Sequence, residues 1–161
     1  MSPITWEYMN LLREEMQVPL VPKGILTVED VKIAIENKYE VVYVSNHGGR
    51  QVDGTPAPFE VIQEMYHEDK SLFDQIDVWA DGGVRYGTDV LKFLALGVKM
   101  VGVGRGLYYP NIYGQEGVAD GLDELYLSLF QAAAASGVTD LKQISADLLN
   151  LDPQVPRHAW G

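Results

Sequence analysis

The fold prediction starts from residues 78–106, which read VWADGGVRYGTDVLKFLALGVKMVGVGRG. Two short runs rich in apolar residues, Val78–Asp81 and Met100–Gly104, have the length and composition of buried β-strands. Between them, Thr88–Leu96 repeats its apolar side chains at helical spacing and stops before Gly97, a residue type common at helix C-termini. A strand, a helix and a second strand in this order predict two parallel strands joined by a crossover helix.

The same alternation runs through most of the chain. The predicted strands are Leu20–Lys23, Val41–Ser45, Val78–Asp81 and Met100–Gly104. The predicted helices are Thr5–Met16, Thr27–Ile35, Pro58–Tyr66, Thr88–Leu96, Gly117–Ser136 and a piece around Leu141–Leu149. The strand spacing is close to that of a TIM-type barrel, but only four βα units are present. We therefore predict an α/β fold, a (βα)4 half of a TIM-type barrel with parallel strands, an extra N-terminal helix and C-terminal helices, forming a single domain over residues 1–161.

The composition narrows the class of protein. The chain has 161 residues, of which 47% are hydrophobic and 22% charged, as in ordinary globular domains. It has no cysteine, which excludes disulfides, zinc–thiolate sites and a cysteine nucleophile, and it carries no recognisable metal-binding motif. The formal net charge of −11 argues against a nucleic-acid partner. With no apolar run long enough for a membrane span and no secretory signal, a cytoplasmic protein is expected.

Glycines and polar residues follow the predicted strands, at the edge where parallel α/β folds bind their ligands. The most informative loop is Ser45-Asn46-His47-Gly48-Gly49-Arg50, directly after the second predicted strand. The His47 side chain suits general-base catalysis, and Arg50 can hold a carboxylate through two parallel hydrogen bonds. The alternative interpretation is that His47 is an exposed or structural loop residue.

Two further loops predict an anion site. They read Asp81-Gly82-Gly83-Val84-Arg85 and Gly102-Val103-Gly104-Arg105-Gly106, and they follow consecutive strands. Glycines let backbone N–H groups approach an anion, arginines add charge-assisted hydrogen bonds, and the last two loops of a barrel are its usual phosphate site. The alternative is that these glycines only turn the chain out of each strand. Lys23, at the end of the first predicted strand, is either a cation facing the ligand or a lysine that extends to solvent.

These strings together resemble one protein family. Pro19–Gly24, Ser45–Gln51, Asp81–Asp89 and Gly102–Arg105 occur in order, and Ser-Asn-His-Gly-Gly-Arg is the most specific of them. They are similar to the FMN-dependent 2-hydroxy acid oxidoreductases, which include glycolate oxidase, lactate oxidase and the flavocytochrome lactate dehydrogenases. The similarity covers nearly the whole chain and corresponds to the carboxyl-terminal half of that family's barrel.

The resemblance implies FMN as the cofactor, a small 2-hydroxy acid as the substrate, and a role for each matching residue. His47 would be the catalytic base, Arg50 would bind the substrate carboxylate, and Lys23 would contact the flavin N1/C2 carbonyl edge. The other cofactor-binding residues would be Ser45, Asp81, Gly82, Gly83, Arg85, Gly104 and Arg105. The family's substrate-pocket tyrosines and the aspartate that orients the histidine belong to its amino-terminal half and have no counterpart in this sequence.

Two interpretations of the function stay open. In the first, the chain is the FMN-binding, catalytic-histidine half of a 2-hydroxy acid dehydrogenase or oxidase. In the second, it is a half-barrel without turnover, which binds FMN or phosphate or is a truncated or engineered unit that assembles into a barrel. Because the edges of a four-stranded parallel sheet need cover, a homo-oligomer or a complementary amino-terminal half-barrel is the expected protein partner.

Overall fold

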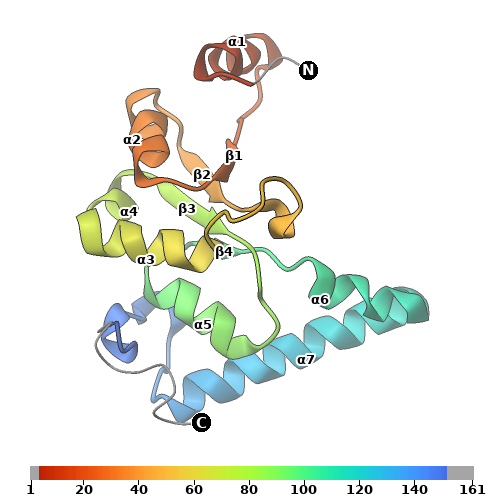
Figure 1. The fold of residues 1–161 in the computed structure, drawn as a ribbon. Coiled ribbons are helices and arrows are strands. Elements are labelled where there is room, and N and C mark those ends of the chain that lie inside the picture. Colours follow the sequence, from red (N-terminus) through yellow and green to blue (C-terminus); the bar gives the residue numbers. More distant parts are fainter. Residues whose placement is uncertain (1–3, 152–161) are drawn as a thin grey trace.

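Four parallel strands form one sheet in the computed structural model, which describes residues 4–151. The strands are β1 (Lys23–Ile25), β2 (Val41–Val44), β3 (Asp77–Ala80) and β4 (Met100–Val101). They lie side by side in chain order, as Figure 1 shows, and all three neighbouring pairs are parallel. This is the order of consecutive βα units in a TIM-type barrel, so the predicted α/β fold class is confirmed.

Helices connect the strands and extend the chain at both ends of the sheet. The α-helices of the described residues are α1 (Trp6–Met16), α2 (Val28–Glu36), α3 (Pro58–Asp69), α4 (Leu72–Gln75), α5 (Gly87–Ala95), α6 (Arg105–Tyr108) and α7 (Gly114–Ala135). Short 3-10 turns are η1 (His47–Gly49), η2 (Pro110–Tyr113), η3 (Leu141–Gln143) and η4 (Ala146–Leu148). The start of α2 is stabilised by a residue next to it in sequence. The Thr27 hydroxyl accepts a hydrogen bond from the Asp30 N–H at 3.1 Å and so caps the helix.

The prediction of one helix around Leu141–Leu149 is wrong. This stretch holds two 3-10 turns, η3 and η4, separated by extended backbone at Ile144. The Asp140 and Ser145 side chains each accept a hydrogen bond from a backbone N–H two residues further on. Such local bonds compete with helical hydrogen bonding, which explains why the apolar spacing alone was misleading.

The first strand lies further along the chain than predicted. β1 begins at Lys23, whereas the sequence pattern placed Lys23 at its end. Pro22 has no N–H to donate, but its carbonyl accepts a hydrogen bond from the Tyr43 N–H at 2.9 Å and so opens the pairing with β2. Gly24 has φ of 101° at an irregularity in the β1–β2 register. β1 is an edge strand of the four-stranded sheet, the position where a neighbouring proline is tolerated.

The two faces of the sheet differ in cover. Residues paired across parallel strands point to the same face. One row of partners is Ile25, Val44, Ala80 and Val101, which pack into the hydrophobic core with side chains of α2, α3 and α5. The opposite row, which we call the open face, is Lys23, Tyr43, Trp79 and Met100. The almost continuous apolar run at Met100–Val103 predicts a strand that is covered on both faces. Met100 is nevertheless 41% exposed within the described part of the chain, so its cover on the open face is incomplete.

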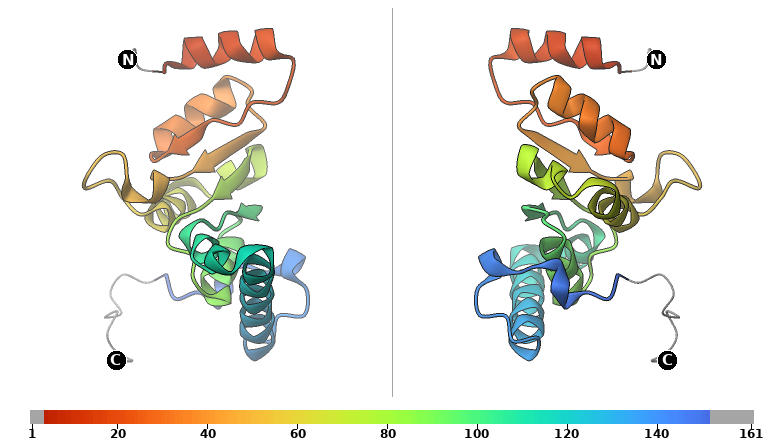
Figure 2. Two further views of the ribbon diagram at one scale, coloured as in Figure 1. Left: turned by 90° about the vertical axis from the view of Figure 1, so that its right-hand side faces the viewer. Right: turned by 90° about the vertical axis from the view of Figure 1, so that its left-hand side faces the viewer.

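The long helix α7 crosses α5 at very close range, below the sheet in Figure 1 and seen from two further sides in Figure 2. The two helices approach closely at Gly87, where an added Cβ would overlap the backbone of Leu129. The Gly87 N–H also donates to the Ser128 hydroxyl at 2.9 Å. Only glycine fits this position, which fixes the start of α5 against α7. No helix among residues 4–151 has the length and apolar character that a membrane span needs.

Candidate functional site

A cavity of about 430 Å³ lies where the loops after β2, β3 and β4 meet the start of β1. Its volume is in the range of small-molecule sites. All the predicted site residues except Ser45 line it: Lys23, His47, Arg50, Asp81, Gly82, Gly83, Arg85, Gly104 and Arg105. Ser45 lines a neighbouring cavity of about 350 Å³, which it shares with Lys23 and His47. The parallel strands thus bring together residues that are far apart in sequence.

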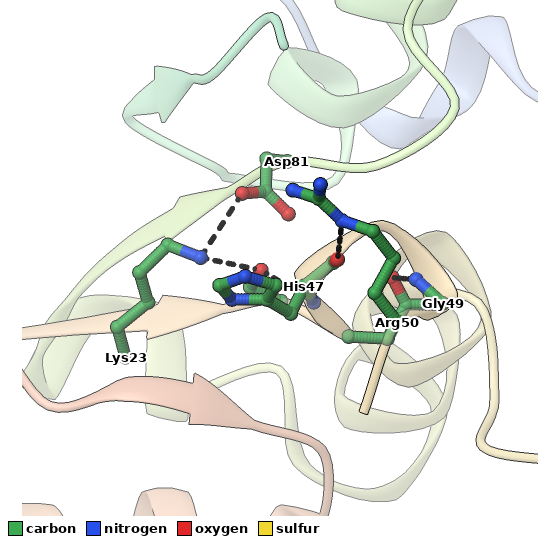
Figure 3. A network of polar contacts seen from close by, with 7 residues as sticks. Lys23, His47, Gly49, Arg50 and Asp81 are labelled. Carbon is green, nitrogen blue, oxygen red and sulfur yellow. Dashed lines mark hydrogen bonds and ion pairs between the residues drawn. The ribbon is translucent and has the colours of Figure 1, made fainter. Parts of the chain in front are cut away.

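The Lys23 ammonium is held from several sides. Its Nζ donates a hydrogen bond to the Ser45 hydroxyl at 2.8 Å. The same Nζ lies 3.3 Å from Asp81 Oδ2, as a dashed line in Figure 3 shows. It also lies 4.9 Å from the centre of the Tyr43 ring, a cation–π distance. Ser45 is almost completely buried and accepts a second hydrogen bond from the His47 N–H at 3.1 Å. One hydroxyl therefore links the lysine to the histidine loop.

The histidine loop turns sharply at the end of β2. His47 has φ of 56°, a left-handed conformation that is uncommon outside glycine, and Gly48 follows with φ of 68°. The Asn46 side chain stabilises the turn, because its Oδ1 accepts from the Gly49 N–H at 3.2 Å and its Nδ2 donates to the Pro56 carbonyl at 3.3 Å. Within residues 4–151 no side chain hydrogen-bonds to the His47 imidazole. Its ring nitrogens remain available to a ligand.

Three arginines converge on the same cavity from three loops. Arg50 Nε donates to the His47 carbonyl at 3.4 Å (Figure 3). Arg105 Nη2 donates to the Gly48 carbonyl at 3.0 Å and so connects the loop after β4 with the histidine loop. Arg85 lies on the loop before α5, whose backbone is fixed where the Arg85 and Tyr86 N–H groups each donate to Asp89 Oδ2 at 3.0 Å. The site is a cluster of positive charge in a chain of net charge −11.

The residues at the base of the cavity have unused binding capacity. Asp81 Oδ1 is buried and has no hydrogen-bond partner among the described residues, so it can accept from a ligand hydroxyl. At Gly83 and Gly104, no described atom lies within 4 Å of the position of an added Cβ, so their backbone is open to a ligand. With Arg85 and Arg105 on the same cavity, these residues fit a ligand that carries both hydroxyl groups and a phosphate.

The sequence analysis missed Tyr43, and it included Gly102 only as part of the loop Gly102–Gly106. An added Cβ at Gly102 would overlap the Tyr43 hydroxyl, so the phenol extends from β2 across β3 to the end of β4. Burial and the nearby Asp81 carboxylate raise the pKa of the Tyr43 phenol. The signal in the sequence was the alternation along β2, because a residue two before Ser45 must point to the same face of the sheet.

Comparison with known proteins places the chain in a family. Residues 1–151 match the model of a family described as FMN-dependent dehydrogenase. Over 151 residues the chain is 42% identical to the L-lactate dehydrogenase (cytochrome) of Saccharomyces cerevisiae and 40% identical to 2-hydroxyacid oxidase 1 of Homo sapiens. Among solved structures, the recombinant flavin-binding domain of baker's yeast flavocytochrome b2 has a TM-score of 0.86 at 42% identity. It is matched over 92% of this chain and 38% of its own.

Fold and site together define an α/β protein with an arginine- and lysine-lined cavity at the carboxyl ends of parallel strands. The chain belongs to the family of FMN-dependent dehydrogenases, as the match over residues 1–151 shows, and the predicted resemblance is confirmed. The two sequence alignments cover 92% and 93% of this chain but only 26% of the yeast relative and 40% of the human one. The chain therefore spans between a quarter and two fifths of these relatives.

Proposed function

We propose that this chain binds FMN in the 430 Å³ cavity and supplies the cofactor-binding, histidine-bearing part of a 2-hydroxy acid oxidoreductase. The observation that carries the proposal is the convergence of Lys23, His47 and three arginines on that one cavity. Relatives named as a lactate dehydrogenase and a 2-hydroxyacid oxidase support the substrate class.

The cofactor contacts follow from the chemistry of the lining residues. Arg85 and Arg105, with the open backbone at Gly83 and Gly104, would bind the phosphate. The unpaired Asp81 Oδ1 would accept a hydrogen bond from a ribityl hydroxyl. The Lys23 ammonium would lie at the edge of the flavin ring that gains negative charge. When bound, FMN supplies the two-electron acceptor that no side chain of this protein provides.

The substrate contacts involve the histidine loop. Arg50 would bind the carboxylate of the 2-hydroxy acid and so orient its C2 atom. The His47 imidazole would accept the hydroxyl proton, while the alcohol carbon loses two electrons and becomes the 2-oxo acid. Because no described side chain orients the imidazole, His47 is expected to be a weak base unless a further protein segment contributes the partner.

We propose that this further segment is a complementary half-barrel that covers the open face. Residues 4–151 build one hydrophobic core, which supports a single domain, yet the row of Lys23, Tyr43, Trp79 and Met100 stays half-exposed within them. The relatives have the additional length that such a segment needs, since the chain covers at most two fifths of the two quoted. A second copy of this chain is the other possible cover, and the molar mass in solution separates the two.

The cofactor proposal is tested by titrating the purified chain with FMN and following flavin fluorescence. We expect saturable 1:1 binding that weakens at least tenfold in Arg85→Gln, because one hydrogen bond to a charged group contributes about 1.5–3 kcal/mol. Arg13→Gln, on α1 away from the cavity, is the matched control and should bind like the unmodified chain. Absence of saturable binding at millimolar FMN would show that the cofactor proposal is wrong.

The activity proposal is tested on the FMN-loaded chain under anaerobic conditions. Bleaching of the flavin absorbance by L-lactate or glycolate, abolished in His47→Ala, would support the oxidoreductase proposal. Bleaching that persists in His47→Ala would contradict the role of His47. Bound FMN that no hydroxy acid reduces would favour the second candidate function, FMN binding without turnover, which the unoriented imidazole of His47 supports.

A further inference from the structure

Tyr43 occupies a central place on the open face, directly beneath the proposed flavin-binding residues. It is the cross-strand partner of Lys23 on one side and of Trp79 on the other. Its ring packs edge-to-face against Trp79, with centroids 6.3 Å apart, and the Lys23 ammonium lies 4.9 Å from the ring centre. The tyrosine is thus fixed by one aromatic neighbour and in turn supports a cation.

The hydroxyl of Tyr43 reaches a second functional residue. It lies over Gly102: a Cβ added to Gly102 would meet both the Tyr43 hydroxyl and the Cβ of Asp81. The same Asp81 carboxylate lies 3.3 Å from the Lys23 ammonium. The Tyr43 side chain therefore lies close to both Lys23 and Asp81. It has room there because Gly102 has no side chain.

The environment of Lys23 depends on these contacts. Its side chain is 43% exposed, and a lysine with that much freedom would otherwise sample many rotamers. The Ser45 hydroxyl, the Asp81 carboxylate and the Tyr43 ring surround the ammonium on three sides. Lys23 also lines the 430 Å³ cavity. Of the three partners, only the Tyr43 ring restrains the lysine without using one of its N–H donors.

We infer that Tyr43 is a positioning residue, which holds the Lys23 ammonium and the Asp81 carboxylate in a fixed arrangement at the base of the cavity. The inference rests on the proposed function, because the ammonium that Tyr43 positions is the one proposed to meet the flavin. Tyr43 acts through Lys23 and Asp81, and it does not itself line the cavity.

The first experiment measures the order of Lys23 in the chain without cofactor. The Nζ resonance of Lys23 is recorded by NMR on ¹⁵N-labelled protein and assigned by its loss in Lys23→Met. We expect Tyr43→Leu to broaden or abolish this resonance, because the ring no longer restrains the ammonium, and Tyr43→Phe to retain it. Tyr66→Leu, which removes a half-buried tyrosine ring on α3 away from the cavity, should leave the resonance unchanged.

The second measurement is the dissociation constant of FMN in the same variants. We expect a rise of about tenfold in Tyr43→Leu and a smaller rise in Tyr43→Phe, while Tyr66→Leu matches the unmodified chain. Gly102→Ala should also weaken binding, because its methyl group displaces the phenol. Adding Tyr43→Phe to Gly102→Ala should restore part of the affinity, since the displaced hydroxyl is gone.

The outcomes separate the inference from the proposed function. If Tyr43→Leu is folded and leaves both the Lys23 resonance and the FMN dissociation constant unchanged, the positioning role is wrong. If Gly102→Ala is equally harmful with and without the Tyr43 hydroxyl, the contact between them has no role. If the unmodified chain does not bind FMN, the proposed function fails, and the Lys23 resonance alone still decides whether Tyr43 positions the lysine.

Discussion

The ion pair between Lys23 and Asp81 should contribute more to stability than the shorter ion pair between Lys32 and Glu68. Lys23 Nζ lies 3.3 Å from Asp81 Oδ2, and the two side chains are 43% and 21% exposed. Lys32 Nζ lies 2.6 Å from Glu68 Oε1, but those side chains are 43% and 44% exposed. Because water screens an exposed pair, the burial of one partner should outweigh the difference in distance.

The expected size of the Lys23–Asp81 coupling follows from its partial burial. At an effective dielectric constant of about 20, two charges this far apart attract by about 5 kcal/mol before desolvation and side-chain ordering are subtracted. Exposed pairs retain less than about 1 kcal/mol, and removing one partner of a fully buried pair costs about 3–5 kcal/mol. A pair with one mostly buried carboxylate lies between these limits, so we expect a coupling of about 1.5 kcal/mol.

A double-mutant cycle measures this coupling. Urea unfolding is followed by tryptophan fluorescence in the unmodified chain, Lys23→Met, Asp81→Asn and the double variant. A parallel cycle with Lys32→Met and Glu68→Gln serves as the matched control and should show the smaller coupling. The reasoning would be refuted if the two couplings were equal, or if the Lys32–Glu68 coupling were the larger one.

Three further predictions test other parts of the structure. Gly87→Ala should lower the free energy of unfolding by about 3 kcal/mol, because its methyl group meets the backbone of α7. Gly121→Ala on α7 is the control: its methyl group meets only side-chain atoms of Pro110 and Leu107, so it should lower the free energy of unfolding in urea far less. The pKa of Tyr43 is raised in the folded chain, so the contribution of its neutral phenol to stability is complete below about pH 10 and is lost as the pH rises further. The free energy of unfolding in urea should therefore decline less steeply between about pH 9 and pH 11 in Tyr43→Phe than in the unmodified chain. Arg13→Ala should accelerate amide hydrogen exchange in α1, because Arg13 donates to the Asn37 carbonyl at 2.8 Å and no residue of α1 is fully buried.

The order of the elements could be predicted from sequence because its signals are local. Thr27 caps α2, and it is also the first residue of the predicted helix Thr27–Ile35. The boundaries of β1 could not be predicted from sequence, because the limits of a strand depend on its pairing with a neighbour. β1 begins at Lys23 because the Pro22 carbonyl accepts a hydrogen bond from the Tyr43 N–H of β2. The cover of the sheet was misjudged for a related reason. Apolar composition indicates that a strand face is suited to burial, and it does not reveal whether the same segment supplies the cover.

The sequence predicted which residues line the cavity better than it predicted the contacts between them. His47, Arg85 and Arg105 were found because parallel strands deliver their loops to one edge of the sheet. The hydrogen bond from Arg105 to the Gly48 carbonyl could not be foreseen, because it depends on how far one side chain reaches across the cavity. The position of Tyr43 over Gly102 is likewise a property of three adjacent strands, and no sequence spacing expresses it.

The contact between Tyr43 and Gly102 also limits how this family can diverge. A larger residue at position 102 is compatible with the fold only if position 43 has first lost its hydroxyl or its ring, since both occupy the same space. We expect the two positions to change together among relatives, with glycine retained wherever the tyrosine is present. A chain can gain the tyrosine at position 43 only after position 102 is already glycine. The geometry of the sheet therefore constrains the order in which the two substitutions occur.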